Sequence, residues 1–318
     1  RGFFCMLLSF IPQRVYYINE VFMMKSKKRI IVVGGVAAGM SFATRYKRLH
    51  PHDEVIVFDK GEYVSFANCG LPYALSDTIR AKARLIVETK ERLGARFEID
   101  VYTETEVVNV DADKKEVTAR HDGKDEVFTY DELVLAPGAK PIKLNIPGLL
   151  DTDTFVLRNI PDLDKIKDKI NEKENQNVIV VGAGFIGLEV AENLKLKGLN
   201  VTVVEKSSHV LPPFDPEMAH LLLKELETND VKIFTNTEIV KVEGKVAHLA
   251  NGEKLPFDFV VMSVGVAADT GFLQDSGIAL SPRGNILVDD HYMTNKQDVY
   301  AVGDAILVKH IITGELVS

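Results

Sequence analysis

One local pattern occurs twice in this chain, and it limits the possible folds more than any other feature. The first copy is RIIVVGGVAAGMSFATRYKRLHPHDEVIVFDK over residues 29–60, and the second is NVIVVGAGFIGLEVAENLKLKGLNVTVVEK over residues 177–206. Each copy contains a β-branched strand, a glycine-rich turn, an amphipathic helix and a second strand that ends in an acidic residue. This order predicts two β–α–β units with parallel strands, and therefore an α/β fold.

The glycines and the acids that end the second strands predict nucleotide binding. Glycines allow a tight turn and a close approach of the backbone to a pyrophosphate, which then lies at a helix N-terminus. The carboxylate at the end of the second strand accepts hydrogen bonds from a ribose diol. Val36 replaces the middle glycine of the first copy, so the alternative that its glycines serve only packing is stronger there. The candidates are Gly34, Gly39 and Asp59 in the first copy and Gly182, Gly184, Gly187 and Glu205 in the second.

Two dinucleotide sites in 318 residues suggest a flavin paired with a nicotinamide, because hydride must pass from one ring to the other. We therefore predict two Rossmann-like domains, the second inserted in the first. The FAD-binding domain is expected at 24–147 and 281–318, and the NAD(P)H-binding domain at 148–280.

Three smaller elements are predicted around these units. Alternating residues over 97–120 predict a small antiparallel β meander. Asp215 is expected to cap, and Pro216 to begin, a helix that continues over 217–226. The last strand of the first domain is expected to return within 285–304.

Composition limits the possible functions. The chain has 38 Lys+Arg against 46 Asp+Glu, a net charge of −8, which argues against nucleic acid as a partner. No run of 18 apolar residues occurs, so no membrane-spanning helix and no membrane partner are expected. The two cysteines, Cys5 and Cys69, are too few for a disulfide framework or a Cys-rich metal site. A cytoplasmic location is the default, and no metal is predicted.

The first 23 residues differ from the rest. The chain begins with Arg1, and GFFCMLLSFIP over 2–12 has the length of a secretory apolar region. However, only one positive residue precedes it and no A-x-A-like site follows. The alternative is that translation starts at Met23 or Met24. We therefore interpret residues 1–23 as an extension or a misassigned start.

Three further motifs, together with the two repeats, resemble the two-dinucleotide flavoprotein disulfide reductases over about residues 29–318. Gly303-Asp304 matches the flavin motif whose Asp holds the ribityl chain. The sequences APG at 136–138 and SVG at 263–265 match the two ATG-like turns, although Pro137 and Val264 depart from the pattern. Beyond the residues already named, the resemblance implies FAD contacts from Val36, Ala37, Lys60, Val107, Ala136, Gly138, Gly303 and Asp304, and NAD(P)H contacts from Phe185, Ile186 and Gly265.

The segment SFANCGLPY over 65–73 is similar to the single-cysteine branch of this family. Relatives that resemble glutathione reductase carry C-x-x-x-x-C here, whereas this chain has Val64 and only Cys69. A single thiol can alternate between a thiolate and a mixed disulfide or a sulfenic acid. Cys69 is expected to open a helix, where the positive end of the helix dipole favours the thiolate.

SFANCGLPY and LPPFDPEM over 211–218 resemble the coenzyme A-disulfide reductases. Related peroxide- and oxygen-reducing NADH enzymes have a His in the first glycine turn, where this chain has Ala37. The resemblance implies that hydride passes from NAD(P)H through FAD to catalytic Cys69, which reduces coenzyme A disulfide. It also implies that Ser65 and Asn68 position this substrate. Arg45 and Arg48 are candidates for its phosphates; the alternative is a solvated basic face shared with Lys47.

Other functions remain open at this stage. The same family contains NADH oxidases and polysulfide or persulfide reductases, and a different class is a catalytically incomplete flavin-binding fragment. The family continues beyond a region like 305–318 into a C-terminal dimerisation domain. We therefore expect a homodimer at full length and weak activity from the chain as printed. Glu205 predicts NADH over NADPH, because a carboxylate repels a 2′-phosphate and Lys206 is the only nearby base.

Overall fold

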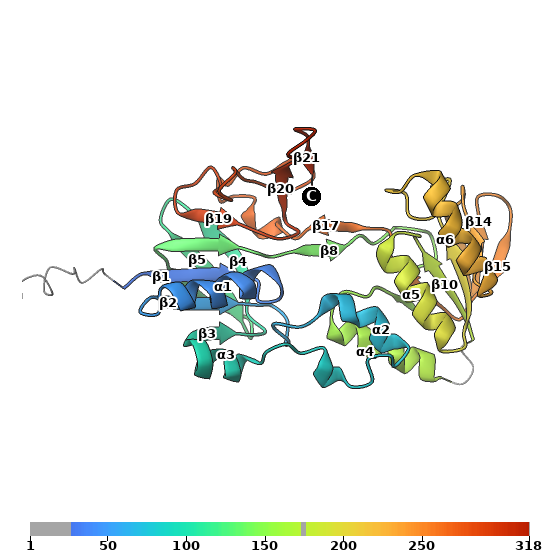
Figure 1. The fold of residues 1–318 in the computed structure, drawn as a ribbon, viewed down its shortest axis with the longest axis horizontal. Helices are drawn as coiled ribbons and strands as arrows, with labels where there is room; N and C mark the ends of the chain where they lie inside the picture. The colour runs from blue at the N-terminus through green and yellow to red at the C-terminus, as the bar shows by residue number, and fades with distance from the viewer. Residues whose placement is uncertain (1–26, 173–175, 318) are drawn as a thin grey trace, which may run out of the picture.

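The computed structural model describes residues 27–172 and 176–317, and over these residues two five-stranded parallel sheets organise the chain (Figure 1). The first sheet has the order β19-β7-β1-β2-β3, and the second has the order β12-β11-β10-β16-β9. The strands of the first are β1 (Arg29–Val33), β2 (Glu54–Phe58), β3 (Ile99–Tyr102), β7 (Glu132–Leu135) and β19 (Val299–Ala301). Those of the second are β9 (Thr154–Phe155), β10 (Asn177–Val181), β11 (Asn200–Val204), β12 (Lys232–Phe234) and β16 (Phe259–Met262). The predicted α/β fold is confirmed.

The two repeats form the centre of the two sheets in the same register. Val33 at the end of β1 lies opposite Phe58 of β2, just as Val181 at the end of β10 lies opposite Val204 of β11. Both central strands are almost wholly buried, because parallel strands are covered on both faces. The two glycine turns therefore begin at equivalent positions, at the carboxyl edges of the two sheets.

The helices cover the sheets and connect their strands. Each repeat supplies one twelve-residue helix, α1 (Ala38–Leu49) or α5 (Phe185–Leu196). The others are α2 (Leu71–Leu75), α3 (Lys90–Phe97), α4 (Ile160–Asn171) and α6 (Pro216–Thr228), with the 3₁₀ turns η1 (Asn68–Gly70), η2 (Lys82–Arg84) and η3 (Gly271–Leu273). Within the described ranges, no helix has both the length and the apolar character needed to cross a membrane.

Pro216 begins α6 and Asp215 occupies its N-cap position, as predicted. The helix continues two residues beyond the predicted end, to Thr228. The Asp215 side chain makes no capping hydrogen bond, so the helix begins without the side-chain cap that this residue could provide.

The predicted meander begins nine residues too early. Residue 97 ends α3, and Glu98 then terminates that helix in the left-handed conformation (φ 53°). The next strand, β3, pairs with β2 in parallel at the edge of the first sheet. Its alternation of buried and exposed residues arises from this edge position, which the sequence does not distinguish from an antiparallel hairpin. The antiparallel sheet itself consists of β4 (Glu106–Asp111), β5 (Glu116–His121) and β6 (Lys124–Thr129).

The strand predicted within 285–304 is divided in two. Its first part, β18 (Ile286–Leu287), pairs with β20 (Ile306–Lys309), which in turn pairs with β21 (Leu316–Val317). Its second part, β19, joins the first sheet. A further three-stranded sheet contains β13 (Ile239–Glu243), β14 (Val246–Leu249) and β15 (Lys254–Pro256).

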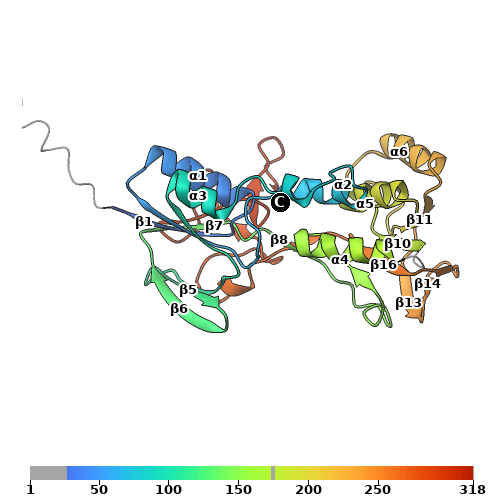
Figure 2. The same cartoon turned by 90° about the horizontal axis from the view of Figure 1, so that it is seen from below.

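The molecule has two lobes, which lie side by side in both views (Figures 1 and 2). We call the part around the first sheet the first lobe and the part around the second sheet the second lobe. A two-stranded antiparallel ribbon, β8 (Ala139–Pro141) with β17 (Val266–Ala268), lies where the chain passes between them. The domain boundaries predicted at 147/148 and 280/281 stay predictions.

Candidate functional site

The two glycine turns have the same backbone. Gly34 and Gly182 both adopt left-handed angles, with φ of 100° and 99°. A Cβ on Gly39 would lie 1.9 Å from the carbonyl oxygen of Gly34, and one on Gly187 would lie 2.0 Å from that of Gly182. The first and third glycines of each turn are therefore required by the turn itself, before any ligand is considered.

The middle position of the turn behaves differently. A Cβ on Gly184 would have no other atom within 4 Å. The equivalent position in the first turn holds Val36, which lines the cavity described below. The departure from the glycine pattern in the first copy is thus sterically accommodated, because the Val36 side chain lies between the cavity and the apolar cluster that it packs against.

The acids at the ends of β2 and β11 are fixed to the glycine turns. Asp59 accepts a hydrogen bond from the backbone N–H of Gly35 (2.7 Å), and Glu205 accepts one from that of Ala183 (2.6 Å). The second carboxylate oxygen of each acid accepts a hydrogen bond from the backbone N–H two residues after that acid, at 2.7 Å in both cases. Burial raises the pKa of the Asp59 carboxyl above its ordinary value, although these two donors oppose the shift.

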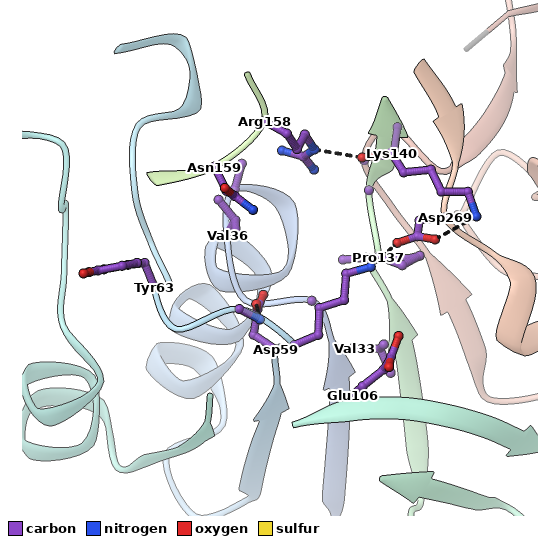
Figure 3. A pocket seen from close by; sticks show the side chains of 18 of the residues that line it. Val33, Val36, Asp59, Tyr63, Glu106, Pro137, Lys140, Arg158, Asn159 and Asp269 are labelled. Atoms are coloured by element: carbon purple, nitrogen blue, oxygen red, sulfur yellow. Dashed lines mark hydrogen bonds and ion pairs between the residues drawn. The ribbon is translucent and has the colours of Figure 1, made fainter. Parts of the chain in front are cut away.

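A cavity of about 730 Å³ lies at the carboxyl ends of β1, β2 and β7 (Figure 3). Its volume lies within the usual range for a small-molecule or cofactor site. All of the residues predicted to contact FAD line it except Gly39, which packs beneath the turn. Those lining it are Gly34, Val36, Ala37, Asp59, Lys60, Val107, Ala136, Gly138, Gly303 and Asp304.

These residues fit a dinucleotide. Helix α1 begins beside the cavity with Ala37 at its N-cap, without a side-chain cap and without an acidic residue in its first turn. Its first N–H groups and its dipole therefore suit a pyrophosphate. A Cβ on Gly34 would approach the carbonyl oxygen of Ala136 to 2.0 Å, so two strand-end turns meet without side chains between them.

Several charged residues in the cavity wall were not predicted from the sequence, among them Lys140, Arg158 and Asp269. Asp269 forms ion pairs with Lys60 and, at 3.3 Å, with Lys140 (Figure 3). Burial raises the pKa of Asp269, but the bonds to the two lysines outweigh burial and leave the pKa below its ordinary value. Arg158 donates from Nε to the carbonyl oxygen of Ala139 (2.8 Å). No local motif marks Lys140, Arg158 or Asp269, because only the crossing of the chain between the lobes brings them to the cavity.

Cys69 carries an exposed free thiol. It lies in η1 directly after Asn68, and Asn68 lines the cavity. With the Asn68 amide oriented to satisfy both of its polar atoms, its oxygen accepts a 2.6 Å hydrogen bond from Nη1 of Arg158. Helix α2 begins only after η1 and has five residues. The predicted helix-dipole effect on the thiol is therefore not supported, since so short a helix has a small dipole.

Ser65, predicted to position substrate, is itself held by backbone contacts. It adopts a left-handed conformation (φ 46°), and its N–H donates to the carbonyl oxygen of Gly35 at 2.9 Å. Its own carbonyl oxygen accepts the N–H of Val87 at 2.7 Å. Ser65 thus fastens the chain before Cys69 to the first glycine turn.

Arg45 and Arg48 are exposed on α1 and do not line the cavity. Lys47 is buried and donates to the carbonyl oxygens of Pro51 and Asp53, both at 2.9 Å. The alternative that these three residues form one solvated face is therefore wrong for Lys47.

The second glycine turn lies apart from the cavity. Phe185 and Ile186 open α5 and are largely exposed, and the Phe185 ring packs edge-on against Phe214. Gly265 follows β16 with φ 113°, and its carbonyl oxygen accepts the N–H of Ile142. Beside Glu205, Lys206 pairs with Glu238 at 3.0 Å.

A family model described as pyridine nucleotide-disulphide oxidoreductase matches residues 28–315. The chain belongs to this family. FAD and NAD(P)H are the cofactors that membership implies for it, consistent with two Rossmann-like nucleotide-binding units. The expectation of an oxidoreductase of the flavoprotein disulfide reductase type is confirmed at the level of the family.

Two coenzyme A disulfide reductases are similar to this pyridine nucleotide-disulphide oxidoreductase in sequence. The Staphylococcus aureus protein (strain bovine RF122 / ET3-1) is 34% identical over 278 residues, and the Staphylococcus epidermidis protein (strain ATCC 35984) is 33% identical over 280 residues. In both cases the match covers 87% of this chain and 63% of the relative. The chain thus spans less than two thirds of the length of these relatives.

Two solved structures share its fold. Reduced CoADR-RHD of Bacillus anthracis is 39% identical with a TM-score of 0.89, and the match covers 92% of this chain and 53% of that one. An NAD-dependent persulfide reductase from A. fulgidus is 32% identical with a TM-score of 0.85, and the match covers 91% of this chain and 55% of that one.

Proposed function

We propose that this protein is an FAD-dependent NAD(P)H:disulfide oxidoreductase that reduces coenzyme A disulfide through Cys69. The observation that carries the proposal is the exposed thiol of Cys69, placed directly after a residue of the cavity that fits FAD. The similarity to two coenzyme A disulfide reductases supports the choice of substrate.

Different residues of the cavity are proposed to bind different parts of FAD. The first turn of α1 would hold the pyrophosphate, Asp59 the ribose diol and Asp304 the ribityl chain. FAD bound there would supply two-electron redox chemistry between the nicotinamide and a disulfide. Arg158 restrains the side chain of Asn68 from the second lobe, and this contact holds the residue before Cys69 at the cavity wall.

Cys69 makes and breaks the sulfur bonds. Its thiolate attacks one sulfur of the coenzyme A disulfide, forming an enzyme–coenzyme A mixed disulfide and releasing one coenzyme A thiolate. The mixed disulfide then receives two electrons and a proton, which originate from NAD(P)H. Its S–S bond breaks, one coenzyme A thiol leaves, and the Cys69 thiolate is restored. Ser65 and Asn68 position the substrate, and Arg45 and Arg48 attract its phosphates.

Glu205 makes NADH the preferred nucleotide. Its buried carboxylate ends β11 beside the second glycine turn, where an adenosine ribose would lie. The nearby Lys206 is paired with Glu238, so its charge is partly neutralised before any 2′-phosphate approaches.

The proposal is tested with Cys69→Ser in the full-length protein expressed with residues 1–23, so that Cys5→Ser serves as the matched control. We expect the Cys69 variant to keep its bound flavin, measured by absorbance, and to lose disulfide-dependent NADH oxidation and thiol release. The Cys5 variant should match the wild type. Near-wild-type reduction of coenzyme A disulfide by the Cys69 variant would exclude Cys69 as the nucleophile.

A further inference from the structure

The segment that carries Cys69 begins in the first lobe but packs into the second. We call residues 64–87 the cysteine segment. Several of its apolar side chains, including those of Leu71, Leu75 and Leu85, are buried in one cluster with Ile160 and Leu163 of α4. Helix α2 contacts both α4 and α5, as the two views show (Figures 1 and 2). The position of the thiol therefore depends on how this segment is held against the second lobe.

Asp77 joins this segment to two helices of the second lobe. Its Oδ1 accepts a 2.6 Å hydrogen bond from Nζ of Lys167 in α4, and its Oδ2 pairs with Lys197 at the end of α5. Lys167 also donates to the carbonyl oxygen of Ala74 in α2, at 3.2 Å. Asp77 has φ of 60°, a conformation that Asp and Asn tolerate better than most other residues.

A second polar contact lies beside this one. The hydroxyl of Ser76 donates to Oδ1 of Asn193 at 2.6 Å, and Asn193 in α5 is 1% exposed. The Asn193 amide in turn donates to the carbonyl oxygen of Glu189 at 2.8 Å. The hydroxyl of Tyr73 in α2 also lies 3.5 Å from a carboxylate oxygen of Glu189. These contacts of Tyr73 and Ser76 are directed at α5.

The thiol lies between two anchors. On one side, Ser65 binds the backbone of the first glycine turn. On the other, Asp77 binds α4 and the end of α5, whose first turn follows the second glycine turn. Cys69 lies four positions after Ser65 and eight positions before Asp77.

We propose that Asp77 is a positioning residue for Cys69, acting through Lys167 and Lys197 to fix the cysteine segment against the nicotinamide-binding lobe. This proposal rests on the proposed function, because the position of Cys69 matters for turnover only if Cys69 is the nucleophile. Removing the bridge leaves the chemical groups in place but lets the segment move between the two nucleotide sites. The turnover number falls as a result, while affinity for the two substrates is kept.

The bridge is tested in the full-length holoenzyme with Asp77→Asn, which keeps a side chain suited to positive φ and removes the charge. A double variant, Lys167→Gln with Lys197→Gln, removes the opposite charges. Asp125→Asn is the matched control, because Asp125 pairs with Arg120 in the exposed β5–β6 hairpin of the first lobe.

Amide hydrogen exchange of residues 68–79 reports the tether without requiring activity. We expect the exchange rate to rise about three- to fivefold in Asp77→Asn and in the double variant. This factor corresponds to the free energy that a partly exposed ion pair typically contributes. The triple variant, Asp77→Asn with both lysine changes, should exchange no faster than the double variant, since both lack the same bridge and both lack the Lys167 bond to Ala74. In 1 M KCl the wild type should approach the variants. The control should exchange at the wild-type rate in this segment.

Steady-state kinetics then separate positioning from a purely structural role. We expect kcat to fall about threefold in Asp77→Asn, because the cysteine segment spends less time in its native position. The KM values for NADH and for coenzyme A disulfide should stay within twofold of those of the wild type. Unchanged exchange in Asp77→Asn would overturn the proposal, and so would faster exchange with an unchanged kcat. Additive effects in the triple variant would also overturn it. The Cys69→Ser result judges the proposed function separately, since the exchange measurement does not depend on it.

Discussion

At the scale of single residues, the glycines of one turn serve two different purposes. Gly187 packs against the carbonyl of Gly182, whereas Gly184 borders open space. We predict that Gly187→Ala destabilises the fold by about 2–3 kcal/mol, because its methyl group would force the turn apart. Gly184→Ala should cost less than about 1 kcal/mol but weaken NADH binding, because its methyl group stands where the pyrophosphate approaches. Denaturant unfolding and NADH titration check both, and equal stability losses in the two variants would refute the distinction.

A second residue-scale prediction concerns Glu238. Glu238→Gln frees Lys206 and removes a negative charge near the expected ribose position. We expect the preference for NADH over NADPH to fall up to about fivefold, the range of one exposed ion pair, mainly through a lower KM for NADPH. Glu243→Gln is the matched control, since Glu243 ends β13 and pairs with Lys241 and His248 rather than with Lys206. A preference unchanged in Glu238→Gln would mean that Glu205 alone sets it.

The positions of the residues in the glycine turns and at the strand ends could be predicted because the pattern is local, whereas their binding roles stay predictions. The glycines and the acids that end β2 and β11 were found because the turn and the strand end impose those residue types within one short segment. The hydrogen bonds that tie Asp59 and Glu205 to the turns have no sequence signal. Arg158 and Asp269 were missed because they reach the cavity from distant segments.

At the scale of elements, the contacts of α2 with α4 and α5 should depend on pH through Asp77. The bond from Lys167, and then that from Lys197, hold the pKa of Asp77 below its ordinary value. The stabilisation is therefore complete above the unfolded pKa, near 3.8, and is lost as pH falls through the lower folded pKa. Because the Asp77 side chain is 42% exposed, its contribution is at most about 1 kcal/mol.

We predict that wild type melts about 2 °C above Asp77→Asn at pH 6–7, and that this difference shrinks below about pH 4. Thermal unfolding at several pH values, in low salt, provides the measurement. A difference that stays constant down to pH 3 would mean that the charge of Asp77 does not stabilise the fold.

Elements built on strong periodicity were predicted with nearly correct ends, as α6 and the two repeats show. The error at β3 arose because an edge strand of a parallel sheet alternates like a strand of an antiparallel sheet. The division into β18 and β19 could not be predicted from the hydrophobic pattern, because such short strands are defined by the strands with which they pair.

At the scale of the whole molecule, a segment that follows β2 of the first lobe completes the core of the second lobe. Phe66, Leu71, Leu75 and Leu85 of the cysteine segment are buried with α4, α5 and the second sheet. A buried side chain of this size contributes about 1.5–3 kcal/mol, so four contribute about 6–12 kcal/mol. That sum is comparable to the stability of a typical domain. The inserted domain predicted at 148–280 therefore lacks part of its own core.

We predict that residues 148–280, expressed alone, do not fold stably, because the surface that receives these four side chains would face water. Circular dichroism and proton NMR should show a partly ordered protein that binds a hydrophobic dye and lacks a sharp thermal transition. Fusing residues 64–87 to this piece through a flexible linker should restore a cooperative transition, because the missing apolar side chains return. If the unfused piece melts as sharply and at as high a temperature as the fused one, the cysteine segment does not complete the core. The lobes would then be independent domains, and the position of Cys69 would depend on the polar contacts of α2 and Asp77 rather than on burial.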